Sequence, residues 1–130
     1  MNEQTGQATN PATIEGRIEH ISGYTIYPQG LTDLFDINAP SFAVNITWRG
    51  EYRGRRGGGW AVTRGTAELL ASSVATGQKW DYPERFRRWQ YRFATFEDAL
   101  AAARAVVDDI KVNGRTWAQW RERQQQEEKA

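Results

Sequence analysis

The 130-residue chain contains no cysteine and a single histidine, His20. Without cysteine it has no disulfide framework, thiolate zinc site, iron–sulfur ligation or cysteine nucleophile. One histidine is too few for a histidine-rich metal site, so we expect no metal and no cofactor. No apolar run approaches the roughly 20 residues of a membrane span, and no signal-peptide pattern opens the chain. These absences predict a cytoplasmic protein without membrane contact.

Recognisable catalytic motifs are also missing. There is no nucleophile elbow, Walker loop, dinucleotide fingerprint or metal-spacing motif, and Gly57-Gly58-Gly59 lacks the Lys-Ser/Thr that a P-loop needs. His20 follows Glu19 in a predicted strand, where alternation places neighbouring side chains on opposite faces. General acid–base catalysis needs groups held together within reach of a substrate proton. We therefore expect no catalytic residues and a protein that is not an enzyme.

The formal net charge of +1 conceals an uneven distribution. Residues 1–47 carry −4, residues 48–92 carry +6 and residues 93–130 carry −1. The basic residues of the middle segment are arginines apart from Lys79, and eight aromatic residues lie among them. Arginine offers a planar fork of donors to phosphate or carboxylate and stacks on rings. Interleaved arginine and aromatic residues are typical of protein and nucleic-acid interfaces.

Alternation of apolar and polar residues predicts strands in several places. Residues 42–48 and 60–64 form the clearest pair and predict an antiparallel hairpin joined by a long glycine–arginine loop. The other predicted strands are residues 13–19, 24–27 and 89–93, and residues 66–75 are read as strand or helix, with strand favoured. Residues 31–40 are apolar enough to lie over a core but too short for a predicted helix.

The strongest helix signal begins near Phe96. Thr95 is a predicted N-cap, and Asp98 occupies the acidic position three residues later. The apolar stripe at helical spacing consists of Phe96, Ala99, Leu100, Ala103, Val107 and Ile110. We predict an α+β fold, in which an antiparallel sheet of three to five strands carries this helix (about 95–109) on one face.

A shorter C-terminal helix that contains Trp117 and Trp120 completes the predicted fold. The two tryptophans either seal one end of the core or present a small docking face. We expect residues 1–12 to be a disordered leader, residues 13–116 a single domain, and residues 117–130 the short helix and a polar tail.

Two arginine clusters provide the candidate binding residues. In the loop of residues 50–59, five glycines allow close backbone approach to an anion, beside arginine side chains. The alternative is a solvated loop whose arginines keep the hairpin soluble. In the second cluster, Arg88, Gln90 and Arg92 would line the exposed face of a strand. The predicted nucleic-acid-binding residues are Arg49, Arg53, Arg55, Arg56, Arg85, Arg87, Arg88 and Arg92, and the predicted partner-binding residues are Tyr52, Trp117 and Trp120.

Several short motifs occur in order between residues 60 and 116. They are Trp60-Ala61-Val62, Gly77 with Lys79-Trp80-Asp81-Tyr82, Arg92-Phe93, the alanine-rich helix from Glu97 to Val107, and Val112-Asn113-Gly114-Arg115-Thr116. As a set they resemble small proteins of unknown function encoded by actinobacteria and their phages. The resemblance implies a small α+β domain from such a background and no particular activity. Residues 1–59 and 85–88, which hold both arginine clusters, lie outside it.

These observations leave two functions open. The first is a non-catalytic nucleic-acid-binding accessory protein of phage or mobile-element origin, whose arginines contact the backbone of DNA or RNA. The alternative is a protein-interaction module that modulates a host or phage protein, in which the same arginines meet an acidic partner. A pull-down with and without nuclease separates the two functions, and the most useful single observation is whether the two arginine clusters share one face of the folded domain.

Overall fold

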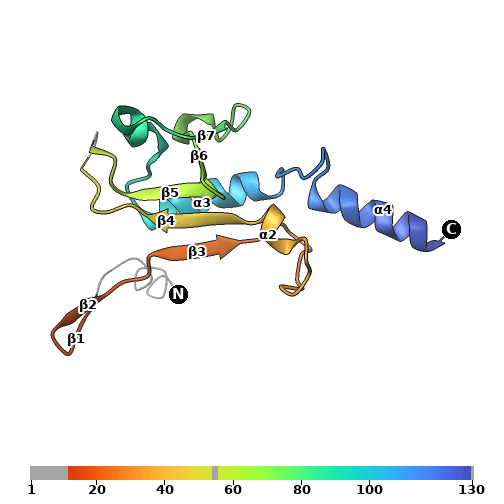
Figure 1. The fold of residues 1–130 in the computed structure, drawn as a ribbon, viewed down its shortest axis with the longest axis horizontal. Helices are drawn as coiled ribbons and strands as arrows, with labels where there is room; N and C mark the ends of the chain where they lie inside the picture. The colour runs from red at the N-terminus through yellow and green to blue at the C-terminus, as the bar shows by residue number, and fades with distance from the viewer. Residues whose placement is uncertain (1–11, 54–55, 130) are drawn as a thin grey trace.

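The computed structural model describes residues 12–53 and 56–129, and Figure 1 shows their arrangement. The fold is α+β, with a five-stranded antiparallel sheet in the order β3-β4-β5-β6-β7 and a separate two-stranded sheet, β1-β2. The strands are β1 (Ala12–Ile14), β2 (Arg17–Glu19), β3 (Gly23–Ile26), β4 (Val44–Trp48), β5 (Trp60–Arg64), β6 (Ala67–Leu69) and β7 (Trp80–Asp81). The helices are α2 (Ala39–Phe42), α3 (Phe96–Val107) and α4 (Trp117–Lys129), with 3₁₀ helices η2 (Ala71–Ser73) and η3 (Arg85–Tyr91).

The predicted central hairpin is confirmed as β4 and β5, with Ile46 opposite Val62 and Trp48 opposite Trp60. Val44 and Ile46 are fully buried whereas Asn45 and Thr47 are half-buried, which is the alternation that the sequence predicts. The predicted start of the strand at Phe42 is wrong. Phe42 ends α2, a single helical turn with proline near its beginning, and its ring is buried in the core.

The predicted helix is confirmed as α3, and Thr95 caps it by accepting a hydrogen bond from Asp98 N at 3.1 Å. Its apolar stripe packs against β3, β4 and β5, so the sheet and this helix enclose the main core. On the opposite side, α3 exposes Glu97, Asp98 and Arg104. Local periodicity and one capping residue therefore place the helix on the sheet as expected.

The strand predicted at residues 89–93 is wrong over most of its length. Residues 85–91 form the 3₁₀ helix η3, and only Phe93 pairs with the sheet, through two N···O contacts of 2.8 Å with Trp60. The spacing of Phe86 and Trp89 fits three residues per turn as well as alternation fits a strand. Residues 66–75 contain both predicted possibilities, since β6 is followed directly by η2.

The C-terminal helix α4 begins at the core and extends away from the sheet (Figure 1). Trp117 is buried and meets the Phe42 ring edge-on at 5.6 Å, while the Trp120 indole N–H donates to Val112 O at 3.1 Å. Both tryptophans therefore close one end of the core. Both rings have contacts within the chain, and that they also bind a partner stays a prediction.

The predicted leader and the segment of residues 31–40 differ in part from what the structure shows. Ala12 belongs to β1, and the rest of the predicted leader, residues 1–11, lies outside the described residues. The segment of residues 31–40, predicted to lie over the core, buries Leu31 and Ala39 but exposes Leu34, Phe35 and Ile37. Within residues 12–53 and 56–129, no helix is long and apolar enough to cross a membrane.

Candidate functional site

The two arginine clusters of the sequence lie against each other in the folded chain. The loop that follows β4 contacts η3, because Arg92 Nε donates a 2.7 Å hydrogen bond to Gly57 O. Gly57 also lies so close to Arg88 that a Cβ at this position would be 3.1 Å from Arg88 Cβ. Residues more than 30 positions apart thus form one surface. We call this surface, the exposed side chains of residues 49–53, 56 and 82–88, the arginine surface.

Two glycines allow the loop to pack this closely. A Cβ on Gly58 would lie 1.8 Å from Glu51 O, and one on Gly59 would lie 2.5 Å from Phe93 O. Backbone hydrogen bonds close the base of the loop, from Gly59 N to Gly50 O at 2.7 Å and from Arg49 N to Gly59 O at 2.8 Å. The base of the glycine-rich loop is therefore a packed structure that fixes where its arginines begin.

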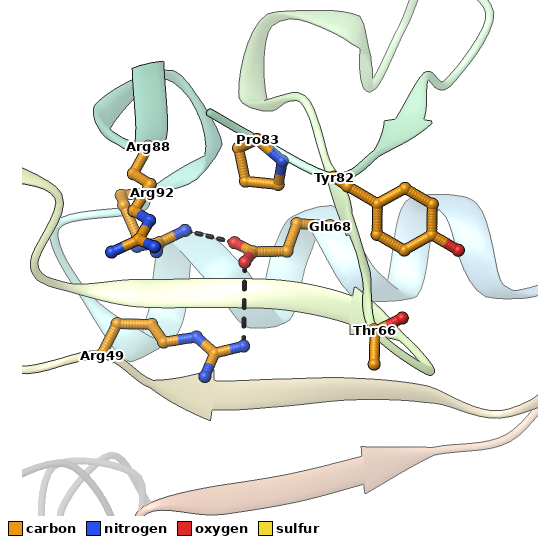
Figure 2. A pocket seen from close by; sticks show the side chains of 7 residues that line it. All are labelled: Arg49, Thr66, Glu68, Tyr82, Pro83, Arg88 and Arg92. Carbon is orange, nitrogen blue, oxygen red and sulfur yellow. Dashed lines mark hydrogen bonds and ion pairs between the residues drawn. The ribbon is translucent and has the colours of Figure 1, made fainter. Parts of the chain in front are cut away.

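A polar pocket of about 350 Å³ opens on the arginine surface (Figure 2). Its lining residues are Arg49, Thr66, Glu68, Tyr82, Pro83, Arg88 and Arg92. Arg49 directly follows β4, Glu68 comes from β6, and Arg88 and Arg92 come from η3 and the residue after it. Three arginines face a single carboxylate, so the pocket has an excess of positive charge.

Glu68 and Arg92 form the buried centre of this pocket. Their side chains are only 10% and 4% exposed, and Arg92 Nη1 donates to Glu68 Oε1. Arg49 Nη2 lies 3.7 Å from the second carboxylate oxygen, as the two dashed lines of Figure 2 show. Burial lowers the pKa of the Arg92 guanidinium, and the adjacent Glu68 carboxylate opposes that shift. The expectation that Arg92 lines an exposed face is wrong, because it anchors the loop from inside.

The remaining predicted arginines differ in whether they already have a partner within the chain. Arg53 pairs with Glu51 at 2.7 Å, and Arg87 lies over the Phe86 ring at 5.6 Å. Arg85 and Arg88 are exposed and one 3₁₀ turn apart, so they point to the same side of η3. Arg49 and Arg56 are exposed on the loop side, whereas Arg55 lies outside the described residues.

Exposed aromatic rings accompany these arginines. Tyr82 is 70% and Phe86 68% exposed, and Tyr82 also lines the pocket. Tyr52, a predicted partner-binding residue, is partly exposed and lines a second depression together with Trp89 and Gln90. The arginine surface therefore combines cationic forks with ring faces that water can reach.

A metal centre and a site built on His20 are two further kinds of site to compare with the described part of the chain. No group of three or more His, Asp or Glu side chains there is arranged to hold a metal ion. His20 packs against both Trp48 and Trp60, at ring distances of 5.0 and 5.6 Å, and the two indoles also contact each other. Besides Glu68 and Pro83, the pocket is lined by arginine and hydroxyl groups, a set of donors that suits an anion with several acceptor oxygens.

Sequence reasoning missed Glu68, which organises the pocket, and Thr66, which lines it. The available signal was the small number of acids in the basic middle segment, four against ten basic residues. A carboxylate within a short apolar strand, as in Ala67-Glu68-Leu69, requires a cationic partner when it is buried. Finding which arginine supplies that partner requires the fold, because Glu68 and Arg92 are 24 residues apart.

Comparisons with protein families, with curated proteins and with solved structures find no match for this chain. The resemblance to actinobacterial and phage proteins therefore stays a prediction. Function has to be inferred from the geometry of the site.

Proposed function

We propose that the protein is a non-catalytic accessory protein that binds single-stranded nucleic acid through the arginine surface. The phosphate contacts come from Arg49, Arg56, Arg85, Arg87 and Arg88, while Tyr82 and Phe86 stack on bases. The observation that carries the proposal is the contact between the loop after β4 and η3, which joins both arginine clusters to exposed rings.

Phosphate is the anion that this set of groups suits best. The pocket is small, polar and open to solvent, and guanidinium forks match phosphate oxygens. Glu68 is already shared between Arg92 and Arg49, so its charge is largely compensated before a ligand arrives. An incoming phosphate then meets the excess positive charge of Arg49 and Arg88.

Single strands are favoured over duplexes because of the exposed rings. A duplex hides the faces of its bases, whereas a single strand presents them to aromatic side chains at about 1–3 kcal/mol per stacked base. The arginines provide contacts along the backbone without reading the sequence. We therefore expect weak sequence preference and strong dependence on salt.

Fluorescence anisotropy with labelled oligo(dT), oligo(rU) and a duplex of equal length tests the proposal. We expect binding to the single strands at low salt, with log Kd rising linearly with log salt. Each phosphate contact on a single strand contributes about 0.7 to that slope. Replacing Arg85, Arg87 and Arg88 with alanine should therefore lower the slope by about two and weaken binding at low salt.

The matched control removes three exposed arginines from the helices α3 and α4 instead, namely Arg104, Arg121 and Arg123. Both variants change the net charge by the same amount, so a general electrostatic effect would weaken both equally. Equal losses, or no affinity for any of the three nucleic acids at low salt, would contradict the proposal. A partner that is retained from cell extract after nuclease treatment, and lost in the η3 variant, would favour an acidic protein ligand instead.

A further inference from the structure

A second surface lies at the other end of β4, and its chemistry is the opposite of the arginine surface. Residues 32–38, between Leu31 and α2, form a segment that we call the acidic–apolar loop. Leu34 is 63%, Phe35 97% and Ile37 90% exposed, which is extreme for side chains of this size. Isolated exposed apolar residues are normal, but three within four positions mark an interaction site.

The loop is a built structure, fixed at both ends. Leu31 and Ala39 are buried in the core on either side of it, and Leu31 N donates to Pro28 O at 3.1 Å. Just before the loop, Gln29 N donates to Asp108 Oδ1 at the end of α3, at 2.8 Å. These anchors attach the loop to the core and to the end of α3.

Two aspartates shape the loop internally. Asp33 Oδ1 accepts a hydrogen bond from Phe35 N at 2.9 Å, and Asp36 Oδ1 accepts one from Asn38 N at 2.8 Å. Side-chain contacts of this kind stabilise tight turns. Each turn directs an apolar side chain outward, Phe35 after Asp33 and Ile37 after Asp36. Because the turns are formed in the free chain, a partner would bind without the cost of ordering this segment.

We propose that the acidic–apolar loop docks into an apolar cleft rimmed by lysine and arginine on a partner protein. Phe35 and Ile37 enter the cleft as anchors, and Asp33 and Asp36 face the basic rim. The charge of the segment supports this partner, since the chain has no basic residue between His20 and Arg49. An anionic bilayer is disfavoured for the same reason, because interfacial segments carry cationic rather than acidic residues.

The two surfaces can be occupied together. The acidic–apolar loop comes before β4 and the glycine–arginine loop after it, so they lie at opposite ends of the strand (Figure 1). The two surfaces share no residue. The proposal is therefore independent of the nucleic-acid binding proposed above, and the two can fail separately.

Site-specific photo-crosslinking of the full chain identifies the partner. A benzophenone amino acid replaces Phe35 in one variant and Phe86, an exposed phenylalanine of the arginine surface, in the control. In cells of the organism that encodes the chain, we expect a protein adduct from position 35 that position 86 does not give. An adduct with a second copy of this chain, an adduct with lipid, or no adduct specific to position 35 would overturn the proposal.

The crosslinked protein is then purified and titrated with the full chain by calorimetry. We expect Phe35→Ala/Ile37→Ala to weaken binding by at least about tenfold, the effect of removing interface anchors, and Phe86→Ala to leave it unchanged. Asp33→Asn/Asp36→Asn keeps the turn acceptors but removes the charge, so it should weaken binding and reduce its salt dependence. Equal affinity of Phe35→Ala/Ile37→Ala and wild type would contradict the proposal, whereas its oligo(dT) affinity reports separately on the arginine surface.

Discussion

The two loops that flank β4 present opposite chemistry although the strand between them has only five residues, about 16 Å. Before β4, the acidic–apolar loop exposes Phe35 and Ile37 beside two aspartates. After β4, the glycine–arginine loop exposes guanidinium groups beside aromatic rings. The comparison shows that one central hairpin fixes two separate surfaces and keeps them apart.

The two ends also differ in what holds them. The acidic–apolar loop is attached by apolar anchors, Leu31 and Ala39, and by turns that its own aspartates close. The glycine–arginine loop is attached through Arg92, which donates to Gly57 O and is itself held by a buried ion pair with Glu68, and by glycines that permit backbone contact. The stability of the fold should therefore respond to lost side-chain volume at the acidic–apolar loop and to lost charge pairing at the glycine–arginine loop.

The largest effect is expected from breaking the buried pair. Glu68→Gln leaves Arg92 buried without a counter-charge and should lower the free energy of unfolding by about 3–5 kcal/mol in urea denaturation. The same substitution at Glu51 breaks an exposed pair with Arg53, so a loss of no more than about 1 kcal/mol is expected. Similar losses in the two variants would show that the buried pair does not hold this end.

At the acidic–apolar loop, one buried and one exposed leucine test whether apolar anchors hold the loop. Leu31→Ala removes a buried anchor and should lower the free energy of unfolding by about 2–5 kcal/mol. Leu34→Ala, three residues later, removes an exposed side chain and should change it by no more than about 0.5 kcal/mol. A large destabilisation by Leu34→Ala would mean that the exposed loop contributes to the core, against the assignment of its apolar residues to a partner.

Close packing of Gly58 against the backbone is a second feature that holds the base of the glycine–arginine loop. Gly58→Ala forces a Cβ into the space of Glu51 O and should destabilise the fold by about 1–3 kcal/mol. It should also weaken oligonucleotide binding, because the loop carries Arg49 and Arg56. Gly23→Ala in β3 serves as the control, since a Cβ there has no neighbour within 4 Å. Unchanged stability of Gly58→Ala would disprove the close packing of the loop base.

The smallest effect concerns Tyr91, the buried last residue of η3. Burial raises the pKa of its phenol above 10.0, and the nearby Asp81 adds to the shift. The unfolded chain then releases the proton first, so stability present below pH 10.0 is lost as the pH rises through the raised pKa. Above that pH, the melting temperature of Tyr91→Phe should therefore fall less steeply with rising pH than that of the wild type. A decline identical to wild type would refute this contribution.

Whether an element of the fold could be predicted from the sequence depends on whether the contacts that form it are local or distant along the chain. The β4–β5 hairpin and α3 depend on local alternation, helical spacing and the Thr95 cap, and all three can be read from sequence. The strand predicted at residues 89–93 was wrong because a short aromatic run fits a 3₁₀ helix equally well. Only Phe93 of that run pairs with the sheet.

The candidate site was predictable in part. Its arginines stood out by composition, but the inward position of Arg92 depends on Glu68, a partner that is distant in sequence. The acidic–apolar loop was read as a cover for the core because apolar residues are usually buried. In the fold, α2 and the buried Phe42 occupy the core beside the loop, so its middle residues remain outside.

The most direct test of the central claim is a titration of the isotope-labelled chain with short oligo(dT), followed by two-dimensional amide NMR at low salt. Binding at the arginine surface should shift the resonances of residues 49–57 and 82–92 and leave residues 31–39 unchanged. Shifts centred on residues 31–39, or no shifts at all, would contradict the claim that the two ends of β4 carry separate functions.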